Sequence, residues 1–385
     1  MILHIANDFN LSKVHSELYR NLDRLDVAED IYIPLRKKSR KGNNHFEFIQ
    51  KQSSYIYSRQ LKGYHRLLFG RKINWLYESL IQSTDVEKYS IIHATTLFSD
   101  GGIAYMLKKK YGKPYIVAVR NTDLNLFFKY MIHLREFGLD VLRNADKIVF
   151  IAPSYLKRLY SLPYLSRYKD MLEKKSVVIP NGIDQFWIDF VEDRKSLNPD
   201  KLHLLYIGSF NKGKNIIGLL KATQLLREKG INVHLNIVGD GGKDYDKMLK
   251  YIDNNKDAYS YHGRITDKES LKQLFRKSDI FVMPSHNETF GLVYIEALSQ
   301  GLPIVYTKNE GIDGIYDSSI GEAVDSYDVE DIAKGIERIY IDYPKYNFNP
   351  KEIVRNHSWD RIATKYFDLY QEVLAVYKGG QISNN

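Results

Sequence analysis

The stretch DIFVMPSHNETFGLVYIEALSQGLP, residues 279–303, contains the signals of a strand, a loop and a helix in succession. Ile280–Met283 is a short apolar run of the kind that forms a buried strand, and the polar loop Pro284–Thr289 follows it. We predict a helix over Leu292–Gln300, because a Gly-Leu-Pro sequence stops it. Parallel α/β sheets bind ligands in loops at the carboxyl ends of their strands. The stretch therefore predicts an α/β fold with Glu288 at a candidate site.

The same alternation of strands and helices runs along the whole chain. Strands are predicted at the short apolar runs Met1–Ala6, Tyr89–Ala94, Tyr115–Val119, Lys147–Ile151, Ser176–Ile179, His203–Ile207, Val233–Val238, Ala258–Tyr261, Ile280–Met283 and Pro303–Thr307. Helices are predicted at Gly102–Tyr111, Ile216–Lys229, Lys268–Lys277 and Leu292–Gln300. The runs lack period-two alternation, which is typical of parallel strands covered on both faces. The order predicts two doubly wound, Rossmann-like domains.

Two domains also fit the length of 385 residues. We predict an N-terminal domain over residues 1–185 and a second domain over residues 200–350. The boundary lies in Gly182–Asp200, where a Pro-Asn-Gly turn precedes a polar stretch. A last helix is predicted over residues 359–378. Its apolar residues share one face and no strand follows it, so we expect it to pack back onto an existing surface.

Composition excludes several classes of protein. Hydrophobic residues make up 44% of the chain and charged residues 27%, which is normal for a folded protein. The absence of Cys excludes a disulfide scaffold, a thiolate zinc site and a Cys nucleophile. Because there is no run of 18 apolar residues and no signal-peptide pattern at the start, we expect a cytoplasmic protein without a membrane span.

The net charge of +9 falls almost entirely in the first 200 residues. This excess either serves solubility or indicates an anionic partner, such as a membrane surface or a phospholipid-linked substrate. Residues 36–41 and 59–77 carry much of it, and the second stretch interleaves Arg and Lys with Tyr, Leu and Trp. Such a pattern is typical of an interfacial segment or of a solvated helix face. No nucleic-acid motif accompanies it, so we expect no nucleic-acid partner.

A basic loop follows the predicted strand His203–Ile207 and opens a helix. Gly208, Ser209 and Lys214 belong to this loop, which suits a diphosphate. It is not a P-loop, because Lys214 is followed by Asn rather than by Ser or Thr. Gly239 begins a glycine turn after the next strand, but the turn lacks the spacing of a dinucleotide fingerprint.

Two loops of the first half lie at the corresponding sheet edge. Arg120 and Asp123 follow the strand Tyr115–Val119, and Asn10, Ser12 and Lys13 follow the first strand. We expect both loops to face a cleft between the domains, with a local ion pair as the alternative for Arg120 and Asp123. No metal site is predicted.

Together these segments resemble the retaining glycosyltransferases of family 4, of the bacterial polysaccharide and O-antigen type, whose GT-B fold has two facing Rossmann-like domains. Glu288 and Glu296 fit the Glu-x7-Glu motif of that family. Asn181-Gly182 lies where the family has its interdomain Pro-Asn-Gly, and Ser358-Trp359 begins a stretch similar to its C-terminal crossover helix.

The resemblance implies roles for individual residues. Donor binding falls to Gly208, Ser209, Lys214, Gly239, Arg264, Glu288, Thr289, Phe290, Gly291, Leu292 and Glu296. Of these, Glu296 would hold the ribose, Glu288 the sugar hydroxyls and Lys214 the diphosphate. Glu288, Lys214, Asp123 and Arg120 are the implied catalytic residues, and Asn10, Ser12 and Lys13 the acceptor side. Ser209 and Arg120 depart from the family, which often has Arg and His there.

The implied reaction moves a hexose from a nucleoside diphosphate sugar, for which we expect UDP, with retention and without a metal or cofactor. The expected acceptor is a glycan or a lipid-diphosphate-linked oligosaccharide in cell-surface polysaccharide synthesis. The basic first half favours the lipid-linked form at the inner face of a membrane. The alternatives are a soluble sugar-phosphate acceptor, a nucleotide-sugar 2-epimerase on the same scaffold, and a non-catalytic binding module.

Overall fold

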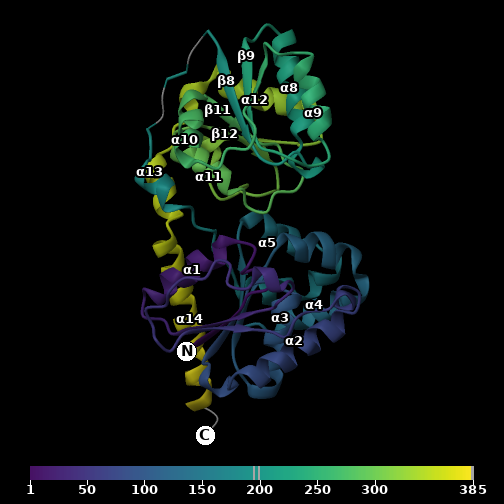
Figure 1. Ribbon diagram of the computed structural model, residues 1–385, viewed down its shortest axis with the longest axis vertical. Helices are drawn as coiled ribbons and strands as arrows, with labels where there is room; N and C mark the ends of the chain where they lie inside the picture. The colour runs from purple at the N-terminus through teal and green to yellow at the C-terminus, as the bar shows by residue number, and fades with distance from the viewer. Residues whose placement is uncertain (194–195, 198–199, 383–385) are drawn as a thin grey trace. The chain divides into compact units, whose positions relative to one another are not determined.

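The computed structural model describes residues 1–193, 196–197 and 200–382 (Figure 1). The chain forms two compact units. The first contains Met1–Ile151, Tyr155–Gly182 and the C-terminal helix, and the second contains Ala152–Ser154 and Ile183–Ser358. The chain passes between them at the start of the expected boundary segment. Residues 194–195 and 198–199 of that segment lie outside the described residues.

The first unit is built on a parallel sheet of seven strands in the order β3-β2-β1-β4-β5-β6-β7. The strands are β1 (Ile2–Ile5), β2 (Glu29–Ile33), β3 (Ser54–Tyr57), β4 (Ile91–Ala94), β5 (Tyr115–Val119), β6 (Lys147–Phe150) and β7 (Ser176–Val178). The five strands predicted in this half are confirmed. Sequence patterns missed β2 and β3, because β2 begins with two acidic residues and β3 is a polar edge strand.

The second unit has a parallel sheet of six strands in the order β10-β9-β8-β11-β12-β13. The strands are β8 (Leu202–Ile207), β9 (Val233–Val238), β10 (Tyr259–Tyr261), β11 (Ile280–Val282), β12 (Ile304–Thr307) and β13 (Gly321–Val324). All five predicted strands are confirmed, and only β13 was missed. It starts at Gly321, whose φ is 149° and where a Cβ atom would lie 1.9 Å from the Ile304 carbonyl oxygen.

Helices connect the strands of both sheets. They are α1 (Lys13–Asp23), α2 (Phe69–Ser83), α3 (Ser99–Tyr111), α4 (Arg135–Asn144), α5 (Pro153–Tyr160), α6 (Lys169–Glu173), α7 (Gln185–Asp189), α8 (Ile216–Glu228), α9 (Tyr245–Asp253), α10 (Lys268–Lys277), α11 (Leu292–Ser299), α12 (Val329–Ile341), α13 (Pro350–Asn356) and α14 (Trp359–Ile382). In the second unit, α8 and α9 lie on one side of the sheet and α10 and α11 on the other (Figure 1). The predicted doubly wound arrangement is therefore confirmed. Among the described residues, none of these helices is long and apolar enough to cross a bilayer.

The last helix, α14, completes the core of the first unit. It runs along α1 (Figure 1), and its apolar face joins the core that α1 and the sheet form. Ile362, Tyr366, Leu369 and Val373 are 1–5% exposed. The start of α14 is fixed as well, because a Cβ atom on Gly182 would lie 2.5 Å from the Trp359 ring.

Truncating Leu369 to Ala is expected to lower the free energy of unfolding by about 2–5 kcal/mol, because it leaves a cavity between α14 and the sheet. Val376→Ala is the matched control. Val376 lies on the same helix but is 72% exposed, so the change should stay within about 0.5 kcal/mol. Urea denaturation of the full chain measures both variants. Equal effects of the two substitutions would contradict the packing of α14.

Candidate functional site

The basic loop after β8 is held in place by one buried side chain. Lys212–Lys214 forms a short turn, and Asn215 follows in the left-handed region with φ 52°. The Asn215 Oδ1 atom accepts the N–H of Gly218 (3.2 Å) and so caps α8. Its Nδ2 atom donates to the carbonyls of Pro284 (3.1 Å) and Ser326 (2.7 Å). Asn215, which breaks the P-loop pattern, thus ties together the loops after β8, β11 and β13.

The glycine turn after β9 lies directly against this loop. Gly239 has φ 146°, and a Cβ atom there would lie 1.9 Å from the Gly208 carbonyl oxygen. The Gly239 N–H donates to the Gly263 carbonyl at 2.9 Å, and its own carbonyl accepts the Tyr261 hydroxyl at 3.1 Å. The loops after β8, β9 and β10 therefore touch through their backbones, which only a residue without a side chain allows.

The structure brings together Lys214 and Glu288, two candidate residues that lie far apart in the sequence. The Lys214 Nζ atom is 2.5 Å from Glu288 Oε2, and Glu288 is 7% exposed. The other oxygen of this carboxylate accepts the N–H of Thr289 at 3.0 Å. The Glu288 N–H donates to Glu310 Oε2 at 3.1 Å. Sequence reasoning missed Glu310, because it lies in a turn after β12 that carries no motif.

The start of α11 lies beside this ion pair. Gly291 has φ 78° and precedes the helix, and a Cβ atom on it would lie 3.2 Å from Glu288 Cγ. No side chain caps α11 and its first turn has no acidic residue, so the helix dipole and the first N–H groups favour an anion. The Phe290 side chain is buried, and Leu292 begins the helix.

Glu296 lies on α11, about one turn of helix after Leu292, and its side chain is half-buried. Burial and the neighbouring Asp184 together raise the Glu296 pKa to about 7, against the opposing effects of Lys268 and a hydrogen bond from Trp187. Lys268 itself pairs with Asp184 at 2.5 Å. Glu296 is therefore a carboxyl group whose charge changes near neutral pH.

The remaining donor-side candidates lie on exposed loops. The Arg264 side chain is 68% exposed and lies 3.8 Å from Asp240 Oδ2, which joins the ends of β10 and β9. Ser209 follows Gly208, and its hydroxyl accepts the Asn211 amide at 3.0 Å. Neither side chain is buried, so both are open to a ligand.

In the first unit, Asp123 is fully enclosed. Its carboxylate accepts the N–H groups of Leu97 (3.1 Å), Phe98 (3.3 Å) and Arg120 (2.8 Å). Burial raises the Asp123 pKa to about 6 against the effect of these bonds. The Arg120 guanidinium donates to the Thr95 carbonyl at 3.1 Å. Asp123 therefore holds the backbone of the loop that contains Arg120. In the described part of the chain, no ion pair joins the Asp123 carboxylate to the Arg120 guanidinium.

The loop after β1 has a capping role. The Ser12 hydroxyl accepts the Val14 N–H at 3.3 Å and caps α1. The Asn10 side chain accepts a bond from the Tyr57 hydroxyl at 3.4 Å, and Lys13 is exposed.

Lys72 lies at the carboxyl edge of the first sheet, and the sequence patterns did not indicate it as a site residue. It lies near the start of α2, and its Nζ atom donates to Ser99 Oγ at 2.6 Å. Burial and nearby Arg36 together lower the Lys72 pKa to about 8, against the opposing effects of Asp100, Asp8 and Asp123. Only the fold brings α2 to the loops after β2 and β4, so no spacing in the sequence reveals this cation.

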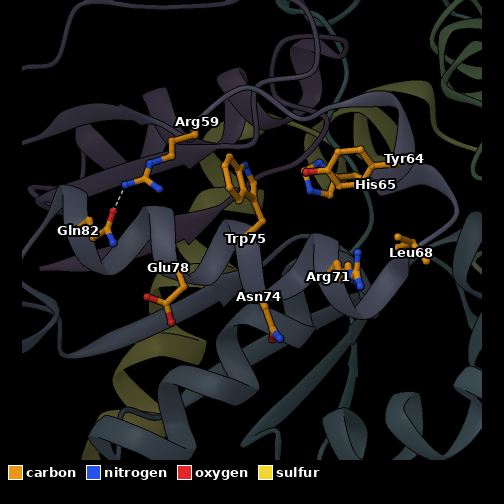
Figure 2. A pocket seen from close by; sticks show the side chains of 9 residues that line it. All are labelled: Arg59, Tyr64, His65, Leu68, Arg71, Asn74, Trp75, Glu78 and Gln82. Carbon is orange, nitrogen blue, oxygen red and sulfur yellow. Dashed lines mark hydrogen bonds between the residues drawn. The ribbon is translucent and has the colours of Figure 1, made fainter.

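The basic and aromatic stretch 59–77 forms a groove of about 670 Å³ along α2 (Figure 2). Its wall is a row in which Trp75 stands between Arg59 and His65, at 5.6 Å from each. Leu68 and Arg71 lie toward the Tyr64 end of the groove in Figure 2.

Comparison with known proteins agrees with this geometry. Residues 189–356 match the family described as glycosyl transferases group 1. The D-inositol 3-phosphate glycosyltransferase of Arthrobacter sp. is 36% identical over 274 residues, which are 66% of this chain and 63% of the relative.

Two solved structures have the same fold. Sucrose-phosphate synthase from Thermosynechococcus elongatus superposes with a TM-score of 0.72 at 20% identity, over 97% of this chain and 99% of that one. The Anabaena protein HepE, in complex with UDP and glucose, does so with a TM-score of 0.65 at 14% identity, over 96% and 99%. The predicted GT-B fold is thereby confirmed.

Proposed function

We propose that this chain is a glycosyltransferase that transfers a hexose from a UDP-sugar with retention of configuration, as its similarity to the group 1 glycosyl transferases suggests. The contact between Lys214 and Glu288 beside the uncapped start of α11 carries the proposal. It combines a cation and backbone amides for a diphosphate with a carboxylate for sugar hydroxyls. The UDP and glucose bound to the similar Anabaena protein support the choice of nucleotide.

In the proposed mechanism, the bond between the anomeric carbon and the diphosphate oxygen breaks as the acceptor oxygen attacks the same face. Negative charge grows on the leaving diphosphate, and Lys214 and the first N–H groups of α11 stabilise that charge. Glu288 orients the sugar through its hydroxyls. The acceptor proton passes to the leaving phosphate, so the step needs no additional base. In this proposal, Lys214 and the N–H groups of α11 offset the negative charge of the diphosphate without a metal ion.

The test is a thermal-shift panel of the full chain with UDP, GDP, ADP, CMP and NAD, followed by calorimetry. Selective stabilisation by UDP is expected, because a ligand that binds only the folded state raises its stability. A response to GDP or ADP alone would reject the choice of base. No response to any of them would reject the donor site. Interconversion of UDP-sugars without an acceptor would instead favour the 2-epimerase.

The affinity for UDP-glucose is expected to rise about three- to tenfold between pH 6 and pH 8. The Glu296 pKa is raised to about 7, so the carboxyl group is mostly protonated at pH 6 and ionised at pH 8. Only the ionised form accepts from both ribose hydroxyls. Calorimetry at both pH values measures the change, and Glu296→Gln should remove it. An equal pH dependence in the variant would contradict the ribose assignment.

For the acceptor, we place a phosphate group at the carboxyl edge of the first sheet. Lys72 supports this, because its ammonium donates to the neutral Ser99 hydroxyl at 2.6 Å, while nearby Asp100, Asp8 and Asp123 act on it through Coulombic interactions alone. The names of two similar proteins, D-inositol 3-phosphate glycosyltransferase and sucrose-phosphate synthase, also refer to phosphorylated molecules. A lipid-diphosphate-linked glycan of cell-surface polysaccharide synthesis and a soluble sugar phosphate both satisfy this chemistry. With either acceptor, Lys72→Gln should raise KM for the acceptor, because it removes the cation that would hold the acceptor phosphate. The affinity for UDP should stay unchanged.

A further inference from the structure

Two segments of the first unit that are far apart in the sequence expose large apolar side chains, and a contact between Phe69 and Phe127 joins them. In residues 64–68, Tyr64, Leu67 and Leu68 are 45%, 88% and 41% exposed. In residues 126–132, Leu126, Tyr130 and Ile132 are 41%, 67% and 64% exposed. We call these six residues the apolar patch. Leucine and isoleucine side chains this exposed, gathered from two loops, mark an interaction surface rather than scattered surface residues.

Contacts between aromatic rings join the two segments. The ring of Phe69 lies 5.5 Å from that of Phe127, and Phe127 stacks on Phe98 at 4.4 Å. Leu68 directly precedes Phe69, and Leu126 directly precedes Phe127. Their exposed side chains therefore leave the protein at one junction, which anchors the patch to the core beneath it.

The two segments that carry the patch are basic. Residues 59–72 contain five Lys or Arg and residues 124–135 contain two, whereas neither segment contains Asp or Glu. Arg71 lies with Leu68 at the Tyr64 end of the groove in Figure 2, and exposed Lys129 has its ammonium over the Tyr130 ring at 5.2 Å. Apolar side chains with aromatic rings and cations beside them suit a bilayer with anionic headgroups. The apolar side chains reach the acyl chains, the rings lie at the interface, and the cations contact the headgroups.

We infer that the apolar patch docks the first unit onto an anionic membrane surface, with Leu67 and Ile132 entering the boundary between headgroups and acyl chains. Arg59, Arg71 and Lys129 contact the headgroups. Because α2 also carries Lys72, the bilayer lies one turn of helix from the cation assigned to the acceptor phosphate. This inference deepens the proposed function and rests on it for the acceptor, since it selects the lipid-linked source of that phosphate. Binding to the membrane does not itself require that the chain transfers a sugar.

The experiment is flotation of the full chain with phosphatidylcholine vesicles that contain or lack phosphatidylglycerol. The wild-type chain is expected to float only with the anionic vesicles and to be released as salt increases. Leu67→Asp with Ile132→Asp should lower the bound fraction at least about tenfold. Ile341→Asp is the matched control, because Ile341 is 74% exposed on α12 in the second unit.

The control should bind vesicles as the wild-type chain does, and UDP-induced thermal stabilisation should be the same in all variants. Equal flotation of the double variant and the control would overturn the inference. Light scattering could also overturn the inference. If the wild-type chain is a dimer and the double variant is a monomer, the patch binds a second copy of the chain instead of a membrane. Loss of the UDP response with intact vesicle binding would reject the donor site and leave the docking standing.

Discussion

Replacing Glu288 by Gln is expected to reduce turnover by roughly 10²–10³-fold while UDP affinity stays nearly unchanged. One Glu288 oxygen lies 2.5 Å from the Lys214 ammonium and the other accepts the Thr289 N–H. An amide of the same shape turns one acceptor into a donor, so it cannot serve both partners and the sugar hydroxyls. UDP lacks the sugar, which is why its affinity should survive.

Steady-state transfer and calorimetry with UDP measure the two effects of Glu288→Gln separately. Glu330→Gln is a suitable control, because the Glu330 side chain is 73% exposed on α12 of the same unit. Turnover of Glu288→Gln equal to that of the control would refute the assigned role. A parallel loss of UDP affinity would instead show that the loop Pro284–Thr289 has collapsed.

Replacing Lys214 by Met is expected to weaken UDP binding about 10- to 100-fold and uridine binding hardly at all. The Lys214 side chain is 29% exposed and its ammonium pairs with Glu288 beside the start of α11, so we expect it to contact a diphosphate but not a nucleoside. Comparing UDP, UMP and uridine by calorimetry isolates the phosphate contribution. Lys221→Met is the control, because Lys221 is exposed on α8. An equal loss for uridine would mean that the substitution damages the fold.

Lys214→Met should also destabilise the second unit, since it leaves the buried Glu288 carboxylate without its cation. Combining it with Glu288→Gln removes both charges and should restore part of the lost stability. A double variant less stable than the sum of the single effects would contradict the ion pair.

Apolar runs were sufficient to predict ten strands and both sheets, but they failed where a strand carries buried charge. In β2, Glu29 lies 2.8 Å from His4, and Asp30 accepts the Tyr89 and Ser54 hydroxyls at 2.6 and 2.7 Å. These partners come from β1, the loop before β4, and β3. A polar residue becomes a core residue only through neighbours that the local sequence does not contain.

The residues of the candidate site also fall into those that the local sequence indicates and those that only the fold brings together. Glu288 and Lys214 could be proposed from the sequence, because each follows a strand and precedes a helix. Glu310 and Lys72 could not, since one lies in a turn and the other within a basic helix. The sequence also suggested a catalytic role for Asp123, which stays a prediction; what the sequence did not indicate is that three backbone N–H groups hold its carboxylate.

The packing of α14 on α1 sets an order of events during translation. The first unit begins at the N-terminus, yet its core includes Ile362, Tyr366 and Leu369 near the other end of the chain. The second unit, Ile183–Ser358, has all its strands before α14 leaves the ribosome. A nascent chain therefore holds an incomplete first unit while the second is already able to fold. Chaperones that shield emerging apolar surface should engage residues 1–182 for as long as the ribosome takes to deliver α14.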